Sequence, residues 1–179
     1  MLEEPDQIEL LKLARTTLEG YLSKGTRPHY RTDNEALRSH AGAFVSLHRG
    51  QELRGCIGQL VADRELFIIV QHCAISAATE DMRFSPVTAD ELPRVKIEIS
   101  VLTPFRRAED IQEIEIGKTG LYIVRGRHRG LLLPQVATQY GWDRETFLNQ
   151  TCRKAGLPTD AWKDPATTIH LFEAQVFSE

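Results

Sequence analysis

The segment from Val95 to Val101 constrains the fold most, because apolar and polar side chains alternate along it without a break. The apolar positions are Val95, Ile97, Ile99 and Val101, and the polar positions between them are Lys96, Glu98 and Ser100. A period of two places successive side chains on opposite faces of a strand. The segment therefore predicts a strand with one buried face, whereas Glu98 and Ser100 lie on the opposite side, facing solvent, a covering helix or a pocket.

Helices and hairpins are predicted around that strand. Helical spacing of apolar residues predicts an N-terminal helix over residues 8–22 and a second helix from an Asp63 N-cap to Thr79. Two hairpins are expected, with turns at residues 48–51 and 126–128, followed by helices at 135–140 and 143–156 and a closing strand at 167–177. This order indicates an α+β fold with a mostly antiparallel sheet and flanking helices, in one domain over residues 1–179.

Composition excludes several classes of protein. The 179 residues carry a formal net charge of −3, which lacks the basic excess of a nucleic-acid-binding protein. A local cluster at Arg125, Arg127, His128 and Arg129 has no interleaved aromatic residues for base stacking, so we do not expect nucleic acid as a partner. The longest apolar run, residues 66–70, is too short to span a membrane, and the acidic N-terminus does not resemble a signal peptide. A cytoplasmic protein with reduced thiols is expected, because the three cysteines form no disulfide framework.

The motif Arg54-Gly55-Cys56-Ile57-Gly58 is the strongest candidate for a functional site. It places a thiol between two glycines at the expected end of the first hairpin, and a nearby guanidinium such as that of Arg54 favours thiolate over thiol. Cys56 is therefore a candidate nucleophile or thiol ligand. The alternative is a small buried residue on a tight turn, since unpaired cysteines are among the most buried residues. Gly55 and Gly58 either open a cradle of backbone N–H groups for an anion or shape a bulge.

Four further residues are candidates for binding. Asp81 and Arg83 form either a polar pair lining a cleft or a surface ion pair, and Ser100 lies on the polar side of its strand. Lys118 follows Gly117, but a phosphate-binding loop would need glycine where Gln112 stands, so Lys118 is assigned to a turn near the cleft. No metal site or cofactor is expected, because no cysteines are spaced as CxxC.

Several blocks of the sequence resemble the AMMECR1 domain family. They are Leu53–Gly58, Arg83–Val87, Ile99–Thr103, Gly130–Ala137, Gly141–Asp143 and Lys154–Leu157. The resemblance implies an α+β fold with two lobes and a cleft beside the cysteine. It also implies Memo-like and radical SAM proteins as partners, as in the AmmeMemoRadiSam system. Two hypotheses follow: Cys56 takes part in a reaction within the cleft, or the protein is a non-enzymatic adaptor that binds a peptide or RNA segment there.

Overall fold

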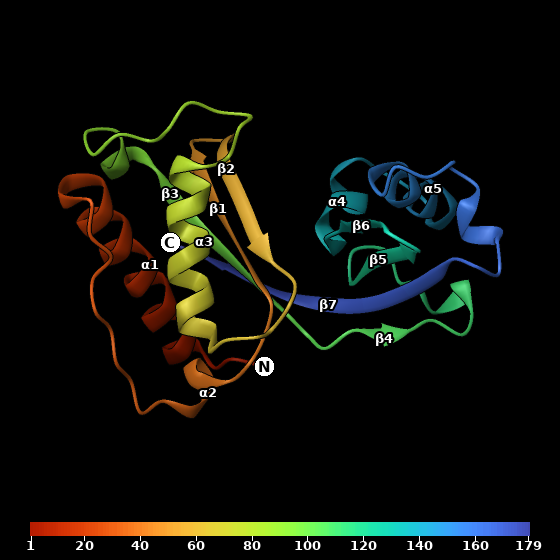
Figure 1. Ribbon diagram of the computed structural model, residues 1–179, viewed down its shortest axis with the longest axis horizontal. Helices are drawn as coiled ribbons and strands as arrows, with labels where there is room; N and C mark the ends of the chain where they lie inside the picture. The colour runs from red at the N-terminus through yellow and green to blue at the C-terminus, as the bar shows by residue number, and fades with distance from the viewer. The chain divides into compact units, whose positions relative to one another are not determined.

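The computed structural model describes all 179 residues and divides them into two compact units. The first unit holds residues 1–102 and 175–179, and the second holds residues 103–174. Both combine helices with antiparallel strands, so the predicted α+β class is confirmed (Figure 1). No helix is long and apolar enough to cross a membrane.

The first unit is a sheet covered on one face by two helices. Its strands lie in the order β2 (Glu52–Gln59), β1 (Ala43–Arg49) and β3 (Lys96–Leu102), with the end of β7 (Thr168–Ser178) beside β3. Helices α1 (Glu4–Lys24) and α3 (Leu66–Thr79) pack on this sheet, and short α2 (Glu35–Arg38) contacts both helices. Val45, Leu47, Ile97 and Ile99 are fully buried in the resulting core, which confirms the predicted buried face of β3, although Ser100 on the opposite side is buried as well.

Two predictions about this unit were wrong. Cys56 does not end its strand, because β2 continues to Gln59 and Cys56 pairs with Ser46 of β1. Asp63 does not cap α3, whose N-cap is Glu65; the Asp63 carboxylate instead accepts a hydrogen bond from Gln59 Nε2. The spacing of apolar residues located the helix, but the side-chain partner of Asp63 is Gln59, the last residue of β2, and therefore depends on where that strand ends.

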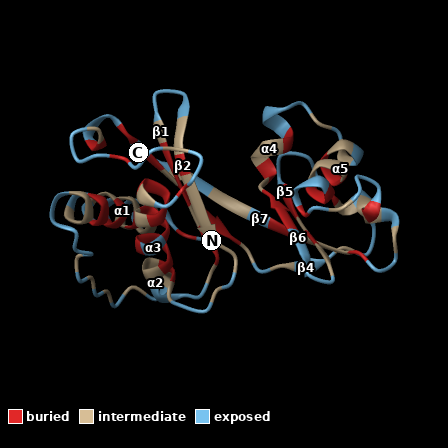
Figure 2. Cartoon of the chain, turned by 45° about the horizontal axis from the view of Figure 1, so that its top comes forward, coloured by how far each residue is buried: buried red, intermediate tan, exposed pale blue.

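The second unit has the same type of architecture. Its strands lie in the order β6 (His128–Leu132), β5 (Thr119–Arg125), β7 and β4 (Arg106–Arg107). Helices α4 (Pro134–Gln139) and α5 (Arg144–Lys154) form a hydrophobic core with the side chains on one side of this sheet. Figure 2 shows the buried residues of this core in red. The predicted cap at Asp143 is confirmed, since its carboxylate accepts from the backbone N–H of Thr146 at 2.8 Å. Three short 3-10 helices complete the chain, at Leu92–Arg94, Ile111–Glu113 and Ala161–Lys163.

Candidate functional site

Cys56 lies on β2, at the edge of the sheet of the first unit. Its backbone N–H donates to Asp81 Oδ2 at 2.9 Å and its carbonyl accepts from Arg83 Nη2 at 3.3 Å. These bonds point away from β1, so Cys56 and Ser46 form the closer type of antiparallel pair, without mutual backbone hydrogen bonds. Their side chains consequently meet, and Ser46 Oγ donates to Cys56 Sγ at 3.2 Å.

Asp81 and Arg83 clamp the free edge of β2 at Cys56. Arg83 donates to the Asp81 carboxylate through Nε at 2.9 Å and Nη2 at 2.7 Å, and the Asp81 side chain is only 5% exposed. The hydrogen bond from the Arg83 side chain is the main cause that lowers the pKa of Asp81 to about 2. Unpaired N–H and C=O groups on an edge strand invite pairing with other chains, and here the ion pair occupies them. Asp81 and Arg83, both predicted as binding residues, therefore contact Cys56 through its backbone N–H and carbonyl groups.

Arg54 is held by a different partner. Its guanidinium binds both carboxylate oxygens of Glu91, at 2.7 and 2.9 Å, and donates to the Ser85 carbonyl at 2.9 Å. The Arg54 and Glu91 side chains are each 12% exposed, and this hydrogen bonding lowers the pKa of Glu91 and raises that of Arg54. The β1–β2 register shifts between Leu47 and His48, next to Arg54, which interrupts the simple alternation along the strand. Arg83 is therefore the guanidinium that contacts Cys56.

Gly55 and Gly58 allow close packing within β2. A Cβ atom on Gly55 would lie 2.0 Å from the carbonyl oxygen of Ala77 in α3, and one on Gly58 would lie 2.1 Å from the ring of Phe44. Neither glycine has a positive φ. Their role in the structure is to let a helix and an aromatic ring approach the strand, and Gly55 also adjoins the register shift at Arg54.

Cys56 is the only thiol that is not fully buried. Cys73 and Cys152 are both 0% exposed, whereas Cys56 has intermediate exposure. Burial raises the pKa of Cys73 to about 12 and raises that of Cys152. Because the thiolate is the reactive form, the two buried thiols of Cys73 and Cys152 are unreactive in the folded protein. Cys56 is therefore the one candidate for thiol chemistry.

The remaining predicted residues take separate places. Ser100 is 2% exposed on β3 and pairs with Phe44, on the side of the sheet that also carries Ser46. Lys118 belongs to the second unit, where its exposed ammonium lies 3.4 Å from Glu115 and 3.7 Å from Glu173. Sequence reasoning missed Ser46 and Glu91, because their roles depend on strand register and on the path of the loop after α3.

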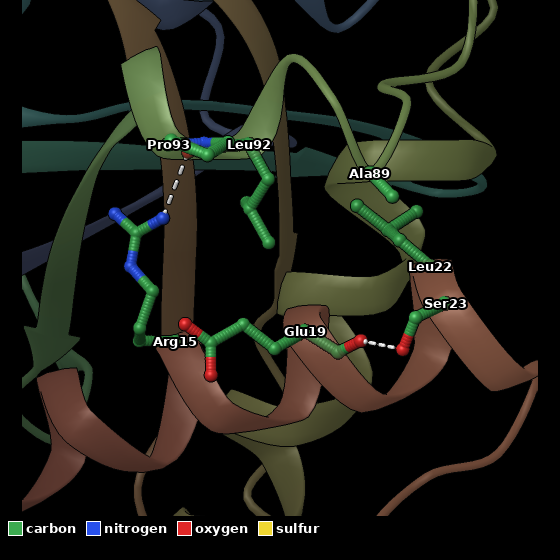
Figure 3. A pocket seen from close by; sticks show the side chains of 7 residues that line it. All are labelled: Arg15, Glu19, Leu22, Ser23, Ala89, Leu92 and Pro93. Carbon is green, nitrogen blue, oxygen red and sulfur yellow. Dashed lines mark hydrogen bonds between the residues drawn. The ribbon is translucent and has the colours of Figure 1, made fainter.

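A groove in the first unit lies apart from these residues. It has a volume of about 480 Å³ and runs between the C-terminal half of α1 and residues 89–93 (Figure 3). Arg15 projects into this region and donates to the Leu92 carbonyl at 3.0 Å. None of the predicted site residues lines the groove. No group of three His, Cys, Asp or Glu side chains is arranged to hold a metal ion.

Comparison with known proteins identifies the family. The AMMECR1 family model matches residues 11–177, and the chain belongs to this family. A protein of Methanothermobacter thermautotrophicus is 44% identical over 95% of this chain and 92% of its own length. A protein of Methanopyrus kandleri is 42% identical over 95% of this chain and 86% of its own. The crystal structure of an uncharacterized protein from Pyrococcus horikoshii superposes with a TM-score of 0.95, at 38% identity, covering 99% of this chain and 93% of the other.

Proposed function

We propose that this AMMECR1-domain protein acts through the Cys56 thiol, which binds or reacts with a small molecule or a modified residue. The observation that carries the proposal is the environment of the sulfur, which accepts a hydrogen bond from Ser46 while the Asp81–Arg83 pair fixes its backbone. The hydrogen bond from Ser46 orients the sulfur, and the fixed backbone keeps it in place for its target. Ser46 is then a positioning residue, and Arg83 supplies positive charge near the sulfur.

Arg83 also suggests the charge of the target. Its side chain is 59% exposed although Nε and Nη2 are bound to Asp81. The arrangement leaves a guanidinium surface beside the thiol that suits a target with an anionic group. Arg54 has a structural role in this proposal, because Glu91 and Ser85 occupy its donors.

We further propose that the protein works with Memo-like and radical SAM partners, as its family membership suggests. Strains lacking each of the three genes should then show the same changes in their small-molecule profile, measured by untargeted mass spectrometry. Changes unique to each strain would contradict a shared pathway.

The role of the thiol can be tested in the strain that lacks this protein. Complementation with wild type should restore the metabolite profile, whereas Cys56→Ala and Cys56→Ser should leave the profile of the deletion strain. Thermal unfolding of each purified variant verifies that it folds. A folded Cys56→Ala variant that restores the profile completely would overturn the thiol proposal and favour a non-enzymatic adaptor.

A further inference from the structure

The second unit carries aromatic rings on the side of its sheet that faces away from α4 and α5. Leu121 and Ile123 of β5 are fully buried in the core shared with the helices, so Tyr122 between them points to the other side. His170 of β7 pairs with Tyr122 in the strand register and therefore shares its side. We call this surface the aromatic face and define it as Phe105, Tyr122, His170 and Phe172.

The four rings form a continuous group. Ring centroids lie 5.2 Å apart for Phe105 and Tyr122, 5.3 Å for Phe105 and Phe172, and 5.9 Å for Tyr122 and His170. Phe172 is 2% exposed and packs over Gly120, which gives it a structural role. Phe105, Tyr122 and His170 are only partly buried, so ring surface remains accessible for stacking.

The polar groups of the two central rings are unused. Neither the Tyr122 hydroxyl nor the His170 ring nitrogens form a hydrogen bond within the second unit. Burial, and then the charge of Arg107, lowers the pKa of His170, so its imidazole is neutral at neutral pH. A neutral imidazole both donates and accepts hydrogen bonds, and the face therefore offers such groups beside its rings.

Two unpaired guanidinium groups flank the aromatic face. Arg107 pairs with His170 in the strand register, and Arg129 pairs with Val124, which lies two residues from Tyr122 on the same side of β5. Both arginines are exposed, and neither forms an ion pair, whereas the neighbouring Arg106 and Arg125 are paired with Glu113 and Asp164. Accessible rings beside uncompensated positive charge fit a ligand that combines a planar ring with an anionic group.

We propose that the aromatic face binds single-stranded RNA, by stacking a base on Tyr122 and Phe105 and holding phosphates at Arg107 and Arg129, which lie on the two outer strands on either side of the rings. The composition of the chain does not predict this, because the four rings come from three distant segments and the net charge is negative. The proposal concerns only the second unit and is independent of the role of Cys56, so either can fail without the other.

Fluorescence anisotropy of a labelled oligouridylate of about ten nucleotides tests the proposal with the full-length chain, since a few nucleotides suffice to cover one stacking platform. Unlabelled uridine monophosphate is added as a competitor. A strong preference for the strand supports the proposal. If the monophosphate displaces the strand at a concentration equal to that of the nucleotides in the strand, the ligand is a free nucleotide and the RNA proposal is wrong. The same strand in a duplex should bind much more weakly, because its bases are already stacked.

Variants separate stacking from nonspecific attraction. Tyr122→Ala should weaken binding about 5- to 100-fold, and Arg107→Gln and Arg129→Gln should each weaken it and lower the salt dependence by about one phosphate contact. Tyr140→Ala is the matched control, because Tyr140 is an exposed tyrosine of the same unit that stacks on Trp142 outside the aromatic face. Arg127→Gln, at the exposed hairpin turn, is the control for charge.

Three further results would overturn the proposal. They are no binding of the strand by the folded wild type, equal affinity for the duplex and the single strand, and an equal loss in Tyr122→Ala and Tyr140→Ala. Loss in the Tyr122 variant with retention in the Tyr140 variant supports it.

Discussion

Both units use glycines to bring a helix and an aromatic ring close to their sheets, but they present different side chains. In the first unit Gly55 of β2 lies against Ala77 of α3, and in the second Gly130 of β6 lies against Ala155, next to the end of α5. Glycine also pairs across strands with an aromatic ring in both units, at Gly58–Phe44 and Gly120–Phe172. A missing Cβ thus brings helix and ring onto the strand in each unit.

The difference lies on the sides of the sheets that face away from the helices. The first unit places the Ser46 hydroxyl and the Cys56 thiol there, with ion pairs holding the neighbouring strand edge. The second unit places the aromatic face there. Glycines therefore set how closely each unit packs, and the two units differ in the side chains on the opposite sides of their sheets.

The largest effect is expected from adding a methyl group at the helix-facing glycines. Gly55→Ala would place Cβ 2.0 Å from the Ala77 carbonyl oxygen, and Gly130→Ala would place it 2.5 Å from the Ala155 nitrogen. Because backbone atoms cannot rotate away, we expect each variant to lose about 3 kcal/mol or more of unfolding free energy, with Gly55→Ala the worse of the two. Urea denaturation monitored by circular dichroism measures both.

Gly126→Ala is the control for these variants. Gly126 has a φ of 60° and no atom near its missing Cβ, so only the left-handed conformation penalises alanine, by about 1 kcal/mol. If Gly55→Ala were no less stable than Gly126→Ala, close helix packing would not explain the glycine in the cysteine motif.

A smaller effect is expected from two carboxylates that titrate alike but differ in burial. The pKa is lowered to about 2 both for Asp81 in the first unit and for Glu113 in the second. The Asp81 side chain is 5% exposed, whereas that of Glu113 is 32% exposed. Asp81→Asn should therefore cost about 2 kcal/mol near neutral pH, and Glu113→Gln should cost less and lose its effect in high salt.

The pH dependence of Asp81→Asn follows from the sign of the shift. The folded pKa lies below the unfolded one, so the ionised carboxylate stabilises the fold above the unfolded pKa and this contribution disappears as pH falls through the folded pKa. The stability difference between wild type and Asp81→Asn should shrink between about pH 5 and pH 2. A difference that stays constant over this range would show that the carboxylate charge does not hold the edge of β2.

Local sequence patterns predicted most of the fold and part of the candidate site. The buried apolar face of β3, the cap at Asp143 and the hairpin turn at Gly126 are local properties, and each is present in the structure. The contact between Ser46 and Cys56 depends on strand register, and Arg54 pairs with Glu91, 37 residues further along the chain, across α3 and the loop that follows it. Side chains that meet through register and loop paths are set by the assembled core, and one sequence does not reveal them.

The smallest predicted effect concerns reactivity rather than stability, and it contrasts the accessible thiol of the first unit with one buried thiol in each unit. Under native conditions iodoacetamide should modify Cys56 and spare Cys73 and Cys152, which are fully buried, and all three should react in denaturant. Ser46→Ala removes the donor to the Cys56 sulfur and should slow its alkylation about fivefold, whereas Ser46→Thr, which keeps a hydroxyl, should retain most of the rate. Peptide mass spectrometry over a time course assigns the rate to each cysteine. An unchanged rate in Ser46→Ala would mean that the hydroxyl does not activate the thiol, and native labelling of Cys152 would mean that the second unit opens more readily than its packing implies.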